Sequence, residues 1–419
     1  MVLEIRISNF FSIKDEVILD FRAGNIRTYK AKALSDNLFS YDDINVLKTI
    51  AIYGANASGK SNIIKAIRFC NALVFESHRH NESTVYNFKP FKFGEESKKL
   101  SSYFIRFVSK EIEYEYAFTL TTKSIVTESL YYYPNGRRAK VFERDERLGG
   151  TKKEKYSFGS SVIKRPMDVA ENTSNKTLYI SRASQMDRAI PKDVFNFFHQ
   201  TFILNYQSYS TRHVYQLIKE YKPQLLAALR FADSDIVDFK QSVRIDKGKN
   251  LNANLVTEEV SFQEANTESL EIKTFHSGAP TIPFDFRTEE SLGTQKLFFI
   301  MLTILHVVKN DKILLIDEIE DSLHTQIINY ILELFNTGKK AQLIFSTHNT
   351  NLLDLDQLRK DQIWFVNKQK DGSTDLYSLY DYNDFRDTMN LEKAYLQGRF
   401  NAVPILNDSS DNFHSIING

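Results

Sequence analysis

Cysteine is nearly absent: Cys70 is the single one among 419 residues. A disulfide within the chain is therefore excluded, as is a zinc site built from a cysteine cluster, and a reducing cytosol fits this composition. Long apolar runs are absent too. The longest, Leu297–Val308, falls short of the roughly 18 residues that a bilayer requires, and Val2–Asp20 carries too many charges for a signal peptide. We expect a cytoplasmic protein without membrane contact.

An excess of either charge is also missing, because 54 Lys and Arg residues oppose 53 Asp and Glu residues. Without a global basic field, contact with nucleic acid requires a local patch. Residues 137–155 form the one basic stretch, in which acidic residues are interspersed. A solvated surface is the usual explanation of such a mixture, but contact with a phosphate backbone stays possible. Its cations are Arg137, Arg138, Lys140, Arg144, Arg147, Lys152, Lys153 and Lys155.

Apolar periodicity predicts strands in the first part of the chain, followed by one helix at a glycine-rich turn. Residues 101–130 alternate with a period of two, which indicates an antiparallel meander. Pro134-Asn135-Gly136 predicts a hairpin that continues it. The other strands are expected at residues 2–7, 17–21 and 45–53, and the helix at 61–74.

The second half predicts a helical block, residues 178–239, and then short polar strands at 245–286. A buried helix at 293–308 follows. Short apolar strands at 312–316 and 342–346 are typical of a buried parallel sheet, with a helix at 323–335 between them that ends near Gly338. We therefore expect an α/β fold in which residues 136–265, a basic hairpin and a helical insertion, separate two halves of one core, 1–135 and 266–419.

The strongest motif is the run from Gly54 to Ser61, which matches G-x-x-x-x-G-K-S between a predicted strand and a predicted helix. The glycines allow backbone N–H groups to point at phosphates, and the helix N-terminus faces the same oxygens. Lys60 would contact the β and γ phosphates, and Ser61 would bind Mg²⁺. ATP and Mg²⁺ are the expected cofactors. The expected contacts are Gly54, Asn56, Ala57, Ser58, Gly59, Lys60, Ser61 and Asn62.

Two later strand ends carry polar residues. Asp317 and Glu318 follow four apolar residues, so Asp317 is expected to bind Mg²⁺ and Glu318 to polarise the attacking water. His348, at the end of the next strand, is expected to contact the γ-phosphate or orient the water. The expected catalytic residues are thus Glu318, His348 and Lys60.

A fourth motif, Ser291-Leu-Gly293, opens the buried helix. A small turn at a helix N-terminus can bind an anion through its backbone and the helix dipole. An ordinary N-cap by Ser291 or Thr294 is the alternative explanation. Together with the other motifs, we interpret Ser291 and Gly293 as nucleotide contacts; we call residues 291–293 the signature turn.

The order of these motifs resembles the P-loop NTPase heads of ABC type in the SMC, RecF and OLD group. The segment from Ile5 to Ile13 is similar to the first strands of such heads. The segments from Asp317 to His324 and from Tyr395 to Pro404 are most similar to stand-alone bacterial phage-defence ATPases of the RloA and AbiLi type. The resemblance covers residues 1–135 and 265–405. Two features depart from it: residues 86–91 lack the usual glutamine, and the signature is Ser-Leu-Gly-Thr rather than Ser-Gly-Gly-Gln.

The resemblance implies an ATPase whose heads pair as a homodimer, each ATP lying between one head's phosphate loop and the other's signature turn. It also implies abortive infection as the setting, with a separate effector such as a nuclease. Only 71 residues follow His348 (419 − 348), too few for a nuclease domain. Two alternatives remain: a DNA-binding repair or tethering ATPase, and a scaffold that binds ATP with little turnover.

Overall fold

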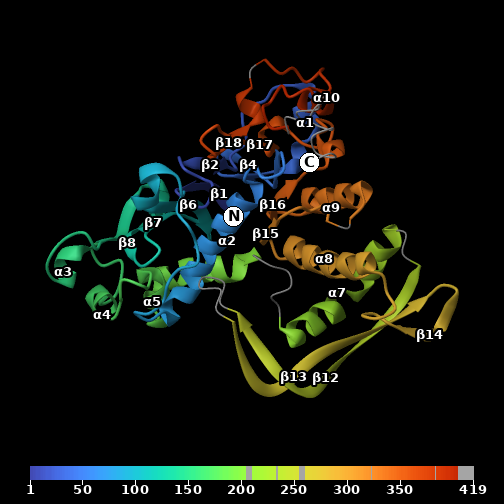
Figure 1. Ribbon diagram of the computed structural model, residues 1–419, viewed down its shortest axis with the longest axis horizontal. Helices are drawn as coiled ribbons and strands as arrows, with labels where there is room; N and C mark the ends of the chain where they lie inside the picture. Colours follow the sequence, from blue (N-terminus) through green and yellow to red (C-terminus); the bar gives the residue numbers. More distant parts are fainter. Residues whose placement is uncertain (204–209, 233–234, 254–259, 322, 383, 404–419) are drawn as a thin grey trace, which may run out of the picture.

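The computed structural model describes residues 1–203, 210–232, 235–253, 260–321, 323–382 and 384–403 (Figure 1). A six-stranded mixed sheet carries the phosphate-loop motif. Its strands are parallel except for β18, at one edge. The order is β11 (Phe202–Ile203), β15 (Ile313–Ile316), β16 (Gln342–Thr347), β5 (Thr49–Gly54), β17 (Ile363–Lys368) and β18 (Thr374–Ser378).

The three central strands of this sheet are buried on both faces, as their uninterrupted apolar runs predict. In β5, Ile50 and Ile52 point into one core, and Ala51 and Tyr53 into a second. The expected strand 45–53 is in fact two, because Lys48 ends β4 (Ile44–Leu47), which pairs with β3 (Leu38–Tyr41).

An antiparallel sheet of seven strands packs across the first core, which confirms the predicted meander. The sheet continues past residue 135, because β9 pairs with β8 through the turn Pro134–Gly136. Residues 139–145 and 156–158, expected in the insertion, therefore belong to the sheet. Its strands are β10 (Tyr156–Phe158), β9 (Ala139–Asp145), β8 (Ile125–Tyr132), β7 (Ile112–Leu120), β6 (Ser101–Ser109), β1 (Val2–Ser8) and β2 (Val17–Asp20).

Helices cover both faces of the mixed sheet (Figure 1). On one side α2 (Lys60–Glu76) fills the first core between the two sheets. On the other, α7 (Thr211–Phe231), α8 (Leu292–Lys309) and α9 (Thr325–Thr337) form the second core. Gly338 ends α9, as predicted. The short helices are α1 (Tyr29–Ala33), α3 (Lys152–Lys155), α4 (Pro166–Glu171), α5 (Tyr179–Gln185), α6 (Ala189–Asn196) and α10 (Leu391–Leu396).

The predicted helical block, 178–239, is interrupted by strand β11, which joins the mixed sheet; residues 204–209 and 233–234 of the block lie outside the described residues. The expected short strands at 245–286 are instead one long ribbon: β12 (Ile236–Ala253) and β13 (Val260–His276), with β14 (Ala279–Asp285) beside the latter. In β12 apolar residues alternate with polar ones only from Val237 to Ile245, and the sequence beyond is mainly polar, so apolar alternation does not mark the strand ends.

By length and composition, α8 is apolar enough to cross a membrane. Its apolar character has another explanation here: Phe298, Met301 and Ile304 are fully buried in the second core. The helix packs against α7, α9 and β15, as a core helix does.

Candidate nucleotide-binding site

The phosphate loop connects β5 to α2 and makes tight backbone contacts. Ala57 and Gly59 have positive φ angles of 59° and 115°. A Cβ atom on Gly59 would lie 2.0 Å from Thr374 Oγ1, and one on Gly54 would lie 2.4 Å from the Val366 carbonyl oxygen. Both glycines are therefore needed for packing, and Gly59 also for its backbone conformation.

Lys60 points back along the loop. Its Nζ donates to the carbonyl oxygens of Gly54 (2.7 Å) and Ala55 (3.0 Å) and lies 3.5 Å from His348 Nδ1. Burial lowers the pKa of Lys60 to about 8, although Glu318 and other nearby carboxylates oppose this change. The ammonium is thus held at the loop with few water molecules around it, where an anion would gain most from it.

Strand order brings the predicted metal ligands together. β16 lies between β5 and β15, so the ends of all three strands meet at one edge of the sheet. Asp317 Oδ1 lies 3.2 Å from Ser61 Oγ and accepts a hydrogen bond of 2.5 Å from Ser346 Oγ. Neighbouring ligands of an octahedral Mg²⁺ at about 2.1 Å are about 3 Å apart, so the Ser61–Asp317 pair fits this ion.

Glu318 and His348 face each other beside this pair. Glu318 has a φ angle of 52°, and its side chain is 56% exposed. Its Oε1 lies 4.0 Å from His348 Nε2. Burial, and then Lys60, lowers the pKa of His348, which favours a neutral imidazole that can accept as well as donate a hydrogen bond.

Two residues of this arrangement, Ser346 and Glu320, were not among the site residues predicted from the sequence, although Glu320 is the next candidate for the general base after Glu318. Ser346, fully buried, bridges the two carboxylate residues, because its Oγ also accepts from the Glu318 N–H at 2.8 Å. Glu320 accepts a hydrogen bond from the His348 N–H. Ser346 belongs to the Ser-Thr-His motif and Glu320 to the Asp-Glu-Ile-Glu run. Their position beside predicted site residues was therefore the sequence signal that could have identified them.

Residues that are distant in sequence form hydrogen bonds with the backbone and side chains of the phosphate loop. Thr374 Oγ1 donates to the Ser58 carbonyl oxygen (3.0 Å) and lies 2.6 Å from Ser12 Oγ. Asn62, a predicted nucleotide contact, instead donates its side-chain N–H to Ser12 Oγ at 2.7 Å. The loop is therefore held between the β1–β2 connection and the β17–β18 hairpin. No sequence motif marked Thr374.

The signature turn forms an ordinary helix N-cap. Ser291 Oγ accepts from the Thr294 N–H at 3.0 Å and lies 2.8 Å from Thr294 Oγ1. Both contacts are with Thr294. They therefore do not connect Ser291 to the phosphate loop of its own chain. The turn is open to solvent, and Leu292 is 76% exposed. An ion pair of 2.6 Å from Lys296 to Asp321 connects its helix to the segment after Glu318.

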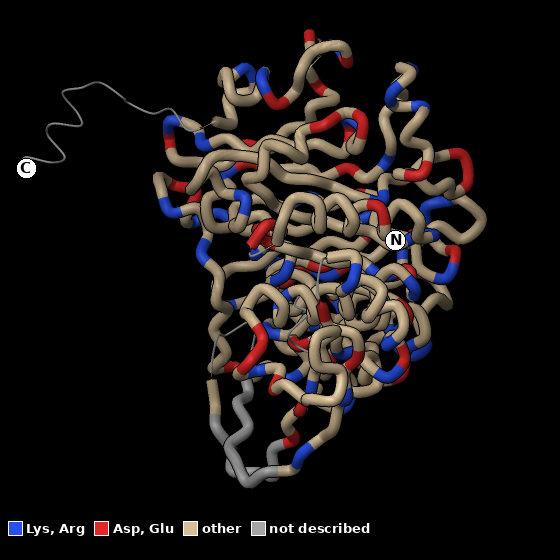
Figure 2. Tube along the Cα trace, turned by 90° about the vertical axis from the view of Figure 1, so that its right-hand side faces the viewer, with Lys and Arg blue, Asp and Glu red and all other residues tan. Residues whose placement is uncertain are grey.

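The basic stretch is largely neutralised by carboxylates, most of them within the stretch, while Glu115 on β7 pairs with Arg138. Lys and Arg are interspersed with Asp and Glu across the molecule (Figure 2). Within the stretch, ion pairs include Arg138, Lys140, Arg144, Arg147, Lys152 and Lys155. Such pairing weakens a phosphate-binding role.

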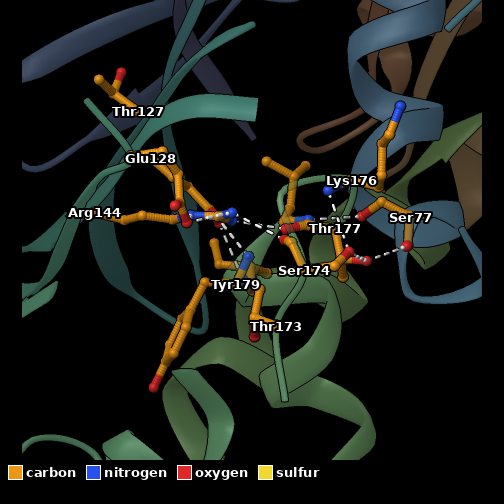
Figure 3. Close-up of polar contacts among 12 residues, drawn as sticks. Ser77, Thr127, Glu128, Arg144, Thr173, Ser174, Lys176, Thr177 and Tyr179 are labelled. Atoms are coloured by element: carbon orange, nitrogen blue, oxygen red, sulfur yellow. Dashed lines mark hydrogen bonds and ion pairs between the residues drawn. The ribbon is translucent and has the colours of Figure 1, made fainter. Parts of the chain in front are cut away.

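One of these cations is structural. Arg144, fully buried, donates to the carbonyl oxygens of Thr177 (2.7 Å) and Ser174 (2.9 Å), and lies 3.6 Å from Glu128 (Figure 3). Glu128 accepts from the N–H groups of Tyr179 (2.6 Å) and Ile180. The pair fastens the segment before α5 to the antiparallel sheet.

Residues 86–91, where a glutamine was missing, contribute to the first core. Tyr86 and Phe88 are buried there, and Phe91 N–H donates to Asn9 Oδ1 at 2.8 Å. The described residues contain no cluster of three or more His, Cys, Asp or Glu side chains arranged for a metal ion.

Comparison with solved structures finds heads of SMC proteins. An SMC head domain from Thermotoga maritima is 16% identical, with 90% of this chain and 98% of that chain covered and a TM-score of 0.39. An SMC head bound to the C-terminal winged-helix domain of ScpA is 17% identical (94% and 99% covered, TM-score 0.39). An SMC head with an extended coiled coil from Pyrococcus furiosus, bound to the C-terminal domain of ScpA, is 15% identical (96% and 99%, TM-score 0.38).

No curated protein matches the sequence. One family model does, over residues 50–354, from the phosphate-loop strand past the strand that ends at Thr347. This range is most of the chain, and it contains the two glycines, the two carboxylates and the histidine whose geometry is given above. The α/β phosphate-loop fold is thereby confirmed, and the chain belongs to the family described as "AAA domain, putative AbiEii toxin, Type IV TA system".

Proposed function

We propose that this protein binds ATP with Mg²⁺ at the end of β5 and hydrolyses it. The observation that carries the proposal is the 3.2 Å approach of Ser61 Oγ to Asp317 Oδ1, beside the buried ammonium of Lys60. Two oxygen ligands and one cation in this arrangement suit a metal-bound polyphosphate.

Each side chain then has a defined task. Backbone N–H groups of residues 54–61 and the N-terminus of α2 receive the phosphates. Lys60 exchanges its bonds to the Gly54 and Ala55 carbonyls for phosphate oxygens. Ser61 and Asp317 would hold the Mg²⁺, whose charge offsets that of the phosphates.

Glu318 is the proposed general base. Its carboxylate is the exposed one of the pair, whereas Asp317 is engaged by Ser346 and Ser61. It accepts a proton from the attacking water as the water oxygen approaches the γ-phosphorus. His348, 4.0 Å away, orients the same water or the γ-phosphate.

The signature turn is proposed to complete the site of a second copy. An open N-terminus with free approach to its backbone suits the γ-phosphate, and the exposed Leu292 suits burial against a partner. ATP would therefore join two chains, and hydrolysis would separate them. Ser291 and Gly293 act in the partner's site in this proposal.

For the biological role, we propose the cytoplasmic ATPase or sensor subunit of a bacterial phage-defence system of the abortive-infection kind, with a separate effector. The family description names a toxin of a toxin–antitoxin system, which supports a setting of controlled toxicity. Expression with and without the neighbouring gene tests this: protection from phage should require both genes and an intact Lys60. Toxicity from this chain alone would make it the effector.

The mechanism is tested by mixing two inactive variants. Ser291→Arg fills the signature turn, and Lys60→Ala removes the phosphate-binding ammonium, so each alone should lose turnover. In a mixed dimer one composite site keeps an intact loop and an intact turn, and partial ATPase activity should return. Normal turnover by Ser291→Arg alone would refute the paired site. ATP binding without turnover by the wild type would make the chain a scaffold.

A further inference from the structure

A histidine connects the long ribbon to the signature turn. His276 Nδ1 lies 2.7 Å from Asp235 Oδ1, and its Nε2 lies 2.8 Å from Glu290 Oε1. Thr274 Oγ1 donates a further hydrogen bond to the same Glu290 oxygen. The imidazole therefore bridges two carboxylates, and we call His276, Asp235 and Glu290 the ribbon clamp.

The three clamp residues come from three separate segments of the chain. Asp235 immediately precedes β12, His276 is the last residue of β13, and Glu290 immediately precedes Ser291. Glu290 is 7% exposed and His276 17% exposed, whereas Asp235 is 66% exposed. The buried half of the clamp thus fixes the backbone next to the signature turn, and the exposed half fixes the base of the ribbon.

The charges around His276 favour the imidazolium. Hydrogen bonds to Asp235 and Glu290 raise the pKa of His276 against the opposing effect of burial. The remaining packed element, β14, contributes the uncharged ring of Phe284, 4.6 Å from the imidazole. Both ring nitrogens can donate only in the protonated form, so the two bonds are complete when His276 carries its charge.

We propose that His276 is a positioning residue for the paired ATP site: through Glu290 it sets where the signature turn meets the partner's nucleotide, and through Asp235 it links that position to the β12–β13 ribbon. The inference rests on the paired mechanism proposed above. A ligand that displaces the base of the ribbon would then also displace the signature turn. The ribbon needs no contact with the nucleotide of its own chain for this effect.

The perturbation is His276→Gln, which keeps one N–H donor but cannot bridge both carboxylates. We expect ATP-dependent dimerisation to weaken at least about tenfold, the scale of one hydrogen bond to a charged group, while ATP affinity of the single chain is unchanged. Lys273→Met is the matched control, because it removes an exposed ion pair of 2.9 Å to Asp285 at the same end of the ribbon. It should leave dimerisation unaltered.

The pH profile supplies a signature that a structural role alone would not produce. Because the folded pKa of His276 is raised, its contribution is complete below the ordinary value of about 6.5 and is lost as the pH rises through the raised value. Wild-type dimerisation should weaken over that window, and His276→Gln should lack this component. Asp235→Asn removes the exposed carboxylate of the clamp and with it part of the increase in the pKa of His276. The pH range over which dimerisation weakens should therefore move to lower pH.

Complementation separates this inference from the mechanism on which it rests. His276→Gln should regain activity when mixed with Lys60→Ala, which has an intact turn, and not when mixed with Ser291→Arg. If Ser291→Arg and Lys60→Ala fail to complement each other, the paired mechanism is refuted. If they succeed while His276→Gln dimerises like the wild type at every pH, the clamp is refuted and the mechanism stands.

Discussion

Replacing Ser346 by alanine should disturb the positions of Asp317 and Glu318 without removing any group that binds the nucleotide directly. Ser346 Oγ, which is fully buried, donates to Asp317 Oδ1 at 2.5 Å and accepts from the Glu318 N–H at 2.8 Å. A hydrogen bond to a charged group contributes about 1.5–3 kcal/mol, and an unpaired buried N–H costs about 1–3 kcal/mol. We expect Ser346→Ala to lower the free energy of unfolding by about 3 kcal/mol.

The functional effect should appear in the Mg²⁺ requirement. Asp317 keeps its contact of 3.2 Å with Ser61 but loses the partner that orients it. Loss of a residue that orients a metal ligand typically costs 10–100-fold in metal affinity. A Mg²⁺ titration of ATP turnover should show a half-saturation shifted by about this factor. Because Glu318 at φ 52° also loses its N–H partner, maximal turnover should fall as well.

The next residue of the strand supplies the control. Thr347 is buried and its Oγ1 accepts from the Asn349 N–H at 3.0 Å, away from the carboxylates. Thr347→Val should destabilise the fold by about 1 kcal/mol and leave the Mg²⁺ half-saturation unchanged. If Ser346→Ala is destabilised while its Mg²⁺ titration matches that of the wild type, Ser346 does not orient Asp317.

Three further outcomes are expected. Lys60→Ala should lose ATP binding in a calorimetric titration while its thermal unfolding stays cooperative; wild-type affinity would refute the phosphate-loop assignment. Glu318→Gln should bind Mg-ATP, accumulate as a dimer and hydrolyse ATP at least about 100-fold more slowly, whereas Asp317→Asn should mainly raise the Mg²⁺ requirement; normal turnover by Glu318→Gln would move the base to another residue. Burial raises the pKa of Glu76, at the end of α2, to about 7, so its folded form binds the proton more tightly and stability falls as the pH rises from about 4.5 to 7. Denaturant unfolding of Glu76→Gln should show a gain of about 2 kcal/mol at pH 8, discounted for partial exposure, and almost none at pH 4; an equal gain at both pH values would contradict the shift.

The sequence predicts the centre of the site because each of its parts is local. The loop from Gly54 to Ser61 and the carboxylates after Ile316 each occupy one strand end, and parallel strands of one sheet bring their carboxyl ends to the same edge. What sequence could not supply is the supporting contact of Thr374 with Ser12, since 362 residues separate them. That contact depends on β18 and the β1–β2 connection meeting behind the loop.

The insertion was the part least accessible to pattern analysis. Strand β11 holds only Phe202 and Ile203, too few residues for any periodicity, and it joins the mixed sheet through β15. The β12–β13 ribbon pairs residue by residue over most of its length, but in β12 the apolar alternation that marks a half-buried strand stops at Ile245. At its base the ribbon packs against α7, and the ring of Phe239 in β12 lies 5.2 Å from that of Phe298 in α8.

An N-cap and an anion site use the same backbone groups, so the N-cap at the signature turn is compatible with the anion site that we propose there. The first N–H groups of α8 have no partner within the helix, and Ser291 engages one of them, on Thr294. The turn is exposed there, with Leu292 at 76%. Glu290, which immediately precedes the turn, contacts His276 Nε2 and Thr274 Oγ1 through its carboxylate. An exposed turn whose preceding residue is held in place is compatible with the contact that we propose to a phosphate bound by a second chain.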